Sequence, residues 1–414
     1  MSKISMDRRS FVAGASALAA TGVLAGCSSD SSSDSSEGST STDDSTSSTA
    51  SFKLGGIGPL TGAAALYGVA AMNAAQIAVD ELAAAGGSVQ FEFQSEDDEH
   101  DAEKSVNAYN TLKDWGMQIL VGCVTTTPCV AVTAESNADN IFQLTPSASS
   151  MDVIGDDTGE YSSEPRKSNV FQMCFTDPNQ GTASAQYIAE QSLGTKIGII
   201  YNNGDAYSTG IYQKFVSEAE AQGLEIVSTT TFTDDSQTDF SVQIADAQDA
   251  GADLVFLPIY YTPASNIFTQ ANAVGYAPTW FGVDGMDGIL SVEGFDTSLA
   301  EGVILLTPFS ADATDDLTVS FVETYNELYG ETPSQFAADG YDCVMMIAQL
   351  IEESGVTADM DSSDICDAMV ATLTGGSFSY SGLTGENMTW SDTGEVAKDP
   401  KAMVIQDGAY VGLD

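Results

Sequence analysis

The stretch QILVGCVTTTP, residues 118–128, decides the fold, because an apolar run of strand length passes directly into three hydroxyl side chains and a proline. Proline lacks an N–H and fits the first turn of a helix, which Thr127 can cap. A second apolar run, IFQLT at residues 141–145, follows after one helix length. The stretch therefore predicts a strand, a helix and a parallel strand.

The same alternation extends in both directions along the chain. Met72, Ala75, Val79 and Leu82 recur at helical spacing until a Gly-Gly pair at 86–87 ends the run. Two series of alternating strands and helices predict an α/β fold with two doubly wound parallel-sheet lobes. The other expected strands cover residues 52–57, 89–93, 196–201, 224–230, 253–259 and 279–283, and the other expected helices cover 102–115, 207–222, 240–250 and 264–274.

The N-terminal residues predict export. Basic residues up to Arg9 precede an apolar, small-residue stretch that stops at Cys27, which is typical of a signal peptide over residues 1–26. The run DRRSFV at 7–12 resembles a twin-arginine signal, although a chance pair in a general secretory signal stays open. LAGC at 24–27 resembles the bacterial lipobox, in which the cysteine receives a diacylglyceryl group. We therefore expect a lipid anchor at Cys27 on the outer side of a bacterial cell membrane.

Residues 27–51 form the next segment, which is almost wholly Ser, Thr, Asp and Gly. Such a composition cannot bury a core and predicts a tether behind the lipidated cysteine. The whole chain of 414 residues carries a formal charge of −48. This charge repels phosphate backbones and anionic headgroups, so nucleic acid is excluded as a partner and we expect membrane contact through the lipid alone.

The sequence offers little for catalysis, cofactors or metals. His100 is the only histidine, and no G-x-S-x-G elbow is present, so serine hydrolase and histidine-rich zinc sites are excluded. Pro59 interrupts a glycine-rich loop at 56–62 whose spacing does not match a dinucleotide site. Calcium in the acidic segments 96–101 or 152–160 is an alternative to solvated turns. We expect no enzyme activity, no cofactor and no metal.

Beyond Cys27, five cysteines remain, an odd number that argues against a full disulfide framework. Most lie in apolar segments, where free cysteine behaves as a small buried hydrophobe. A bridge between Cys123 and Cys129 remains an alternative. The five are Cys123, Cys129, Cys174, Cys343 and Cys366.

Polar side chains follow several expected strands, at the edge where parallel sheets gather ligands. Hydroxyls and free amides at residues 125–127 suit a carboxylate at a helix N-terminus. Ser147 and Ser149 can add a hydroxyl and a carbonyl, and Asp284 can pair with an ammonium. Helix capping is the alternative explanation for the hydroxyl residues.

At these positions the chain from residue 52 onward resembles the branched-chain amino-acid type of periplasmic binding protein, which serves ABC importers. The similarity lies in the order and spacing of many short pieces over most of the chain. These pieces are GPLTG at 58–62, YG at 67–68, the helix at 73–87, DD at 97–98, VG at 121–122, TTT at 125–127, TPSAS at 145–149, Asp177, QG at 180–181, Asp205, Tyr207, Gly210, Phe240 and GYD at 340–342.

The resemblance implies two lobes joined by three crossover segments, the type I periplasmic-binding-protein fold. It implies an N-terminal lobe of residues 52–175 and 306–380 and a C-terminal lobe of residues 176–305 and 381–414, with crossovers near 174–177, 305–308 and 378–383. Some relatives bridge two cysteines near the mouth of the cleft, where this chain has His100 and Thr125. The implied ligand-binding residues are Tyr67, Thr125, Thr126, Ser147, Ala148, Ser149, Tyr207, Tyr261 and Asp284.

We therefore expect a monomeric, lipid-anchored solute-binding protein that closes on a small amino acid, of the branched-chain type, and delivers it to an ABC permease with its ATPase. A binder of an amide, urea or aromatic acid in the same fold is an alternative. A ligand-sensing subunit that signals to a membrane partner is another.

Overall fold

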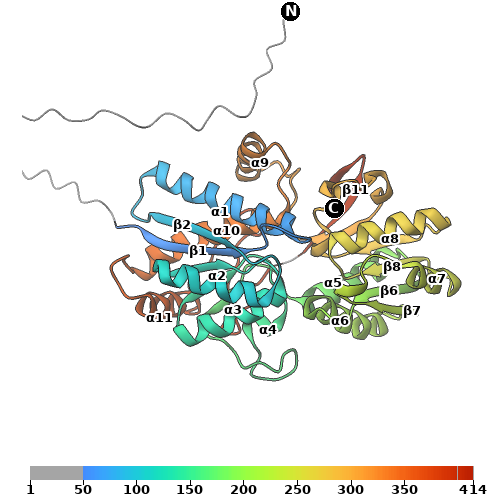
Figure 1. The fold of residues 1–414 in the computed structure, drawn as a ribbon, viewed down its shortest axis with the longest axis horizontal. Coiled ribbons are helices and arrows are strands. Elements are labelled where there is room, and N and C mark those ends of the chain that lie inside the picture. The colour runs from blue at the N-terminus through green and yellow to red at the C-terminus, as the bar shows by residue number, and fades with distance from the viewer. Residues whose placement is uncertain (1–49, 399, 414) are drawn as a thin grey trace, which may run out of the picture. The chain divides into compact units, whose positions relative to one another are not determined.

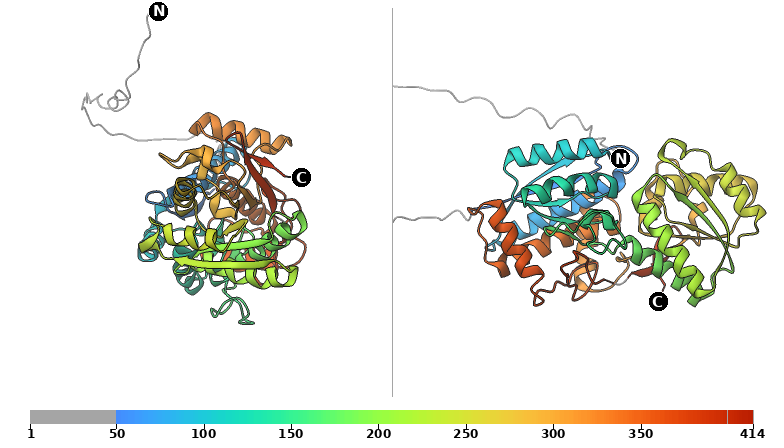
Figure 2. Two further views of the ribbon diagram at one scale, coloured as in Figure 1. Left: turned by 90° about the vertical axis from the view of Figure 1, so that its right-hand side faces the viewer. Right: turned by 90° about the horizontal axis from the view of Figure 1, so that it is seen from below.

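A computed structural model describes residues 50–413 except residue 399. The predicted signal peptide, Cys27 and nearly all of the predicted tether lie outside the described residues. The two lobes are distinct in the right-hand view of Figure 2. No described helix is long and apolar enough to cross a membrane.

The first lobe is built on a five-stranded parallel sheet in the order β2-β1-β3-β4-β5. In Figure 1, α1 and α2 lie on opposite sides of β1 and β2, so helices cover both faces of this sheet. The strands are β1 (Phe52–Gly58), β2 (Phe91–Asp97), β3 (Ile119–Gly122), β4 (Phe142–Thr145) and β5 (Val170–Gln172). The helices are α1 (Ala65–Ala85), α2 (Ala102–Trp115), α3 (Thr126–Asp139), α4 (Met151–Ile154), α9 (Asp316–Tyr329), α10 (Gln335–Ser354) and α11 (Ser362–Leu373).

The second lobe holds a seven-stranded sheet in the order β12-β11-β10-β9-β8-β6-β7. Its strands from β6 to β10 run parallel, while β11 and β12 form an antiparallel hairpin at the edge beside β10. The strands are β6 (Lys196–Asn202), β7 (Glu225–Phe232), β8 (Leu254–Leu257), β9 (Thr279–Gly282), β10 (Ile304–Thr307), β11 (Lys401–Gln406) and β12 (Ala409–Gly412). The helices are α5 (Asp177–Gln191), α6 (Ala206–Gln222), α7 (Ser241–Asp249) and α8 (Tyr261–Val274), with short 3-10 turns η1 (Asp234–Ser236), η2 (Asp284–Met286), η3 (Ile289–Ser291) and η4 (Thr297–Ala300).

The chain crosses between the lobes after β5, after β10 and before β11. The third crossing comes later than the sequence implied. Residues 381–398 stay with the first lobe, because the buried Asp342 of α10 accepts hydrogen bonds from the amides of Leu383 and Thr384, both at 2.9 Å. The Trp390 indole also donates to the carbonyl of Gln172 at 2.8 Å. The chain enters the second sheet only at β11.

The predicted elements appear with end points shifted by a few residues. The helix that Thr127 is expected to cap begins two residues earlier, at Thr126, with Thr125 as its N-cap residue. The helix after β1 begins at Ala65, seven residues before Met72, the first apolar position that predicts it. Its early turns place Tyr67 near the other lobe.

Helices α1 and α10 pack against each other unusually closely. A Cβ atom at Gly340 would lie 2.3 Å from the carbonyl oxygen of Ala71, so only glycine permits this approach. The contact brings the N-terminal turns of both helices, with Tyr67 and Phe336, to the same edge of the first lobe.

Candidate functional site

A small cavity of about 10 Å³ lies where the carboxyl ends of strands from both lobes meet. This volume holds about one water molecule. The first lobe contributes Tyr67, Val124, Thr125, Thr126, Ser147 and Phe336, and the second contributes Tyr207, Tyr260, Asp284 and Gly285. Six of the nine residues expected at the site therefore line one cavity: Tyr67, Thr125, Thr126, Ser147, Tyr207 and Asp284.

Asp284 is the charged group of this cavity. It opens η2, two residues after β9 ends at Gly282. Neighbouring side chains fix its carboxylate: the Tyr207 hydroxyl donates to Oδ1 at 2.5 Å, and the Gln180 amide donates to Oδ2 at 2.9 Å. Burial raises the pKa of Asp284 to about 7, although these hydrogen bonds and the Gly285 amide oppose the shift. Because burial makes ionisation of this carboxylate unfavourable, a cationic partner would stabilise its charged form strongly.

The N-terminus of α3 faces the same cavity. Thr126 and Thr127 occupy its first helical positions, where backbone N–H groups have no acceptor within the helix. The Ser147 hydroxyl donates to the carbonyl of Val124 at 2.6 Å, which leaves its oxygen free to accept a hydrogen bond. One side of the cavity thus offers donors and the positive end of a helix dipole, and another side offers a carboxylate.

Aromatic rings form the remaining wall. Tyr207 and Tyr260 stack with centroids 4.9 Å apart, and the Tyr67 ring lies 4.3 Å from Phe336. Tyr260 occupies the position expected for Tyr261. The Tyr261 hydroxyl instead points to the first lobe and donates to the carbonyl of Ala63 at 2.8 Å, because Tyr261 is the first residue of α8 and projects in a different direction.

Two further expected residues do not line the cavity. The carbonyl of Ala148 is taken by the Gln172 side chain at 2.9 Å. Ser149 is fully buried, and its hydroxyl lies beside Asp177, whose carboxylate is also buried. Burial raises the pKa of Asp177 well above its usual value. Ala148 and Ser149 are therefore buried next to the cavity and do not line it.

Two more buried aspartates, Asp177 and Asp205, lie near the cavity without lining it. Asp205, at the N-cap of α6, is buried, and burial raises its pKa to about 7. Among the described residues, no lysine, arginine or histidine forms an ion pair with Asp177, Asp205 or Asp284. The cleft therefore favours a ligand that carries a positive charge.

His100 and Thr125, the positions at which some relatives have cysteines, contact each other at the mouth of the cleft. The Nδ1 atom of His100 lies 2.8 Å from Oγ1 of Thr125. Burial lowers the pKa of His100, so the imidazole is neutral at pH 7 and adds no charge. The contact joins the segment after β2 to the N-cap of α3 by a hydrogen bond.

Residues 51–409 match the family model described as periplasmic binding protein. The chain belongs to the periplasmic binding protein family. The fold and the resemblance inferred from the sequence are thereby confirmed, and proteins of this family act outside the cytoplasm.

The relatives of this family member include Leu/Ile/Val-binding protein homolog 3 of Brucella melitensis, 24% identical over 376 residues that cover 88% of this chain and 94% of the relative. Among solved structures, a leucine-binding protein from Thermotoga maritima has a TM-score of 0.76 at 22% identity, covering 88% of this chain and 98% of that one. A Rhodopseudomonas palustris solute-binding protein with benzoate has a TM-score of 0.75 at 18% identity, covering 88% and 96%. These structural similarities establish the fold.

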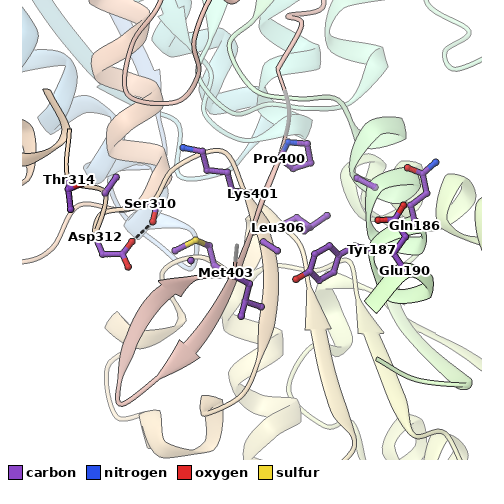
Figure 3. Close-up of a pocket in the computed structure, with 15 residues that line it drawn as sticks. Gln186, Tyr187, Glu190, Leu306, Ser310, Asp312, Thr314, Pro400, Lys401 and Met403 are labelled. Atoms are coloured by element: carbon purple, nitrogen blue, oxygen red, sulfur yellow. Dashed lines mark hydrogen bonds between the residues drawn. The ribbon is translucent and has the colours of Figure 1, made fainter. Parts of the chain in front are cut away.

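In this binding protein, a larger groove of about 680 Å³ lies between α5 and the hairpin of β11 and β12 (Figure 3). Gln186, Tyr187 and Glu190 of α5 form one wall, and Lys401 and Met403 of β11 form another. The groove is open to solvent and lined by only one lobe and crossover segments. It lacks the convergent buried polar groups of the interlobe cavity, so we assign the site to the cavity.

Tyr260 and Phe336 are the main residues that sequence reasoning missed. Tyr260 directly follows the predicted strand at 253–259, whereas the resemblance implies its neighbour Tyr261. Phe336 lies in α10, far along the chain, and carries no local signal of a site.

The described residues contain no group of three or more Asp, Glu, His or Cys side chains arranged to hold a metal ion. The five cysteines in this part of the chain are buried and free. Cys123 and Cys129 are close together, with the Cys123 amide donating to Sγ of Cys129 at 3.2 Å.

Proposed function

We propose that this protein captures a small amino acid by closing its lobes around it and delivers it to an ABC importer. The observation that carries this proposal is the pairing, in one cavity, of the buried Asp284 with the unpaired amides at the start of α3. An amino-acid zwitterion has the complementary charges: its ammonium pairs with the carboxylate and its carboxylate with the helix N-terminus.

The size of the cavity supports a ligand with a short side chain. With the lobes in contact, the four aromatic rings leave space for about one water molecule. A ligand must therefore enter with the lobes apart, and the Tyr260 ring must give way if the side chain is large. Glycine, alanine and serine, and then valine, are the ligands expected to bind with the least rearrangement.

The aromatic wall also gives some support to a second candidate, a planar aromatic acid or amide. Two observations weigh against an acid. Asp284 would repel its carboxylate, and no cationic side chain among the described residues pairs with this or the neighbouring aspartates. A neutral amide would escape this repulsion but would leave the helix N-terminus without an anion.

Calorimetric titration of the purified protein tests the proposal, using the twenty standard amino acids, benzoate, urea and short amides. We expect heat from small aliphatic amino acids and none from benzoate. Binding of benzoate or urea without any amino acid would overturn the amino-acid proposal and favour the second candidate. Mass spectrometry of small molecules released on denaturation gives an independent identification.

A further inference from the structure

Behind Asp284, Gln335 of the first lobe makes two hydrogen bonds to the second lobe. Its side-chain amide donates to the carbonyl oxygen of Asp284 at 2.7 Å. Its backbone amide donates to Oδ2 of Asp287 at 2.8 Å. Both partners are in or directly after η2, the turn that carries the charged group of the site.

The second bond is a helix cap supplied by the other lobe. Gln335 is the first residue of α10, a helix of 20 residues, and its own N-cap residue, Ser334, makes no capping hydrogen bond through its side chain. Helix N-termini require acceptors and favour negative charge. Asp287 supplies both, although it belongs to the second lobe.

Asp287 is buried in this position, with 6% of its surface exposed. Its neighbour Gly288 is held by the Tyr410 hydroxyl of β12, which accepts from the Gly288 amide at 3.0 Å. The carboxylate is thus fixed to the second lobe and meets the helix only when the lobes are together. Separation of the lobes would leave the first amide of α10 without this acceptor.

We propose that Asp287 is a closure latch: it caps α10 across the cleft and, through Gln335, couples lobe closure to the placement of Asp284. Asp287 does not line the cavity, so it acts as a positioning residue rather than a ligand contact. The latch stabilises the closed form relative to the open form whatever the ligand is.

Residue-resolved hydrogen exchange on the ligand-free protein tests this proposal. Besides Gln335, two backbone amides bonded across the cleft serve as probes: Leu66 donates to the Tyr261 hydroxyl at 3.3 Å, and Tyr261 donates to the Tyr67 hydroxyl at 3.2 Å. In Asp287→Ala, all three should exchange on the order of 10-fold faster, because a hydrogen bond to a charged group is lost from the closed form. Asp287→Asn keeps an acceptor but loses the charge. Its exchange rates should lie between those of the unchanged protein and those of Asp287→Ala.

Asp296→Ala is the matched control, because Asp296 caps η4 within its own lobe by accepting from the Ser298 amide at 3.1 Å. This control should leave the three amides unchanged. Faster exchange at Gln335 alone would show a local cap and overturn the latch, as would an equal effect of the control. Stopped-flow dissociation of L-alanine adds a second reading, expected to be faster in Asp287→Ala. If none of the twenty standard amino acids binds, the proposed ligand class fails, while hydrogen exchange still decides the latch.

Discussion

The hydroxyl of Tyr207 donates a 2.5 Å hydrogen bond to Oδ1 of Asp284 inside the interlobe cavity and accepts one from the Gly285 amide at 2.9 Å. The tyrosine thereby fixes the carboxylate and the backbone next to it in one arrangement. A Cβ atom at Gly285 would lie 2.5 Å from this hydroxyl, so the arrangement also requires glycine there.

Replacing Asp284 by Asn should abolish most of the affinity for an amino acid. The change keeps the shape but removes the only charge that lines the cavity and can pair with a ligand ammonium. Loss of a buried charge partner costs about 2–5 kcal/mol, roughly 30-fold or more in Kd. Calorimetry checks this result, with Asp296→Asn as an exposed control. Unchanged affinity in Asp284→Asn would contradict a role for Asp284 in ammonium binding.

Affinity for an ammonium-bearing ligand should rise with pH up to about 7. Burial between the closed lobes raises the pKa of Asp284 to about 7, so at lower pH a proton must leave before the ammonium can pair with the carboxylate in the closed form. The expected decrease in affinity is up to about tenfold per pH unit below 7. Titrations between pH 5 and 8 in two buffers of different ionisation enthalpy would measure both the affinity and the released proton. An affinity that does not change between pH 5 and 8 would show that Asp284 is already charged at pH 5 before the ligand binds.

Thermal stability of the ligand-free protein should show the opposite trend. Burial raises the pKa values of Asp205 and Asp284 to about 7, above those of the unfolded chain, so the folded state binds more protons between about pH 4 and 7. The unfolding free energy contributed by these groups is fully present below about pH 4 and is lost as pH rises through 7. Calorimetric scans from pH 5 to 8 should therefore give a decreasing Tm, less steep in the Asp284→Asn variant.

Replacing Tyr260 by Ala should change selectivity rather than only affinity. Removal of the ring that stacks on Tyr207 enlarges the cavity, so binding of leucine or phenylalanine should improve on the order of 10-fold relative to alanine. Tyr261→Phe is the matched control, because it loses the hydroxyl that bonds the carbonyl of Ala63 across the cleft. It should weaken all ligands about equally. Equal effects of the two variants would contradict a size-limiting role for Tyr260.

Replacing Gly340 by Ala should destabilise the first lobe. The added Cβ atom would lie 2.3 Å from the carbonyl of Ala71, and α1 and α10 would have to separate, at a cost of about 1–3 kcal/mol. Chemical denaturation measures the loss. Gly87→Ala should have little effect, since nothing lies within 4 Å of the new atom. Equal stability of the two variants would show that the helices adjust freely.

Cys27→Ser should release the protein from membranes and leave ligand affinity unchanged. The prediction follows from the lipobox-like LAGC at 24–27, in which the cysteine would carry the lipid. Membrane fractionation of cells that express each form provides the measurement. Retention of the serine variant on membranes would contradict the lipid-anchor proposal.

Sequence alone determined the alternation of strands and helices, because apolar periodicity and end signals such as Pro128 and Gly86 act within a few residues. It also indicated Thr126, Ser147 and Asp284, since polar residues that follow buried parallel strands gather at one sheet edge. The order and spacing of the short pieces were enough to indicate the family.

Only the tertiary structure decided which of these residues share a cavity. It placed Tyr260 there instead of Tyr261, because helix geometry aims neighbouring side chains in different directions. It brought in Phe336 and the pairing of Gln335 with Asp287, which are 48 residues apart and join different lobes. It also kept residues 381–398 with the first lobe through the buried Asp342. Such contacts depend on how distant segments pack, and local sequence patterns do not predict them.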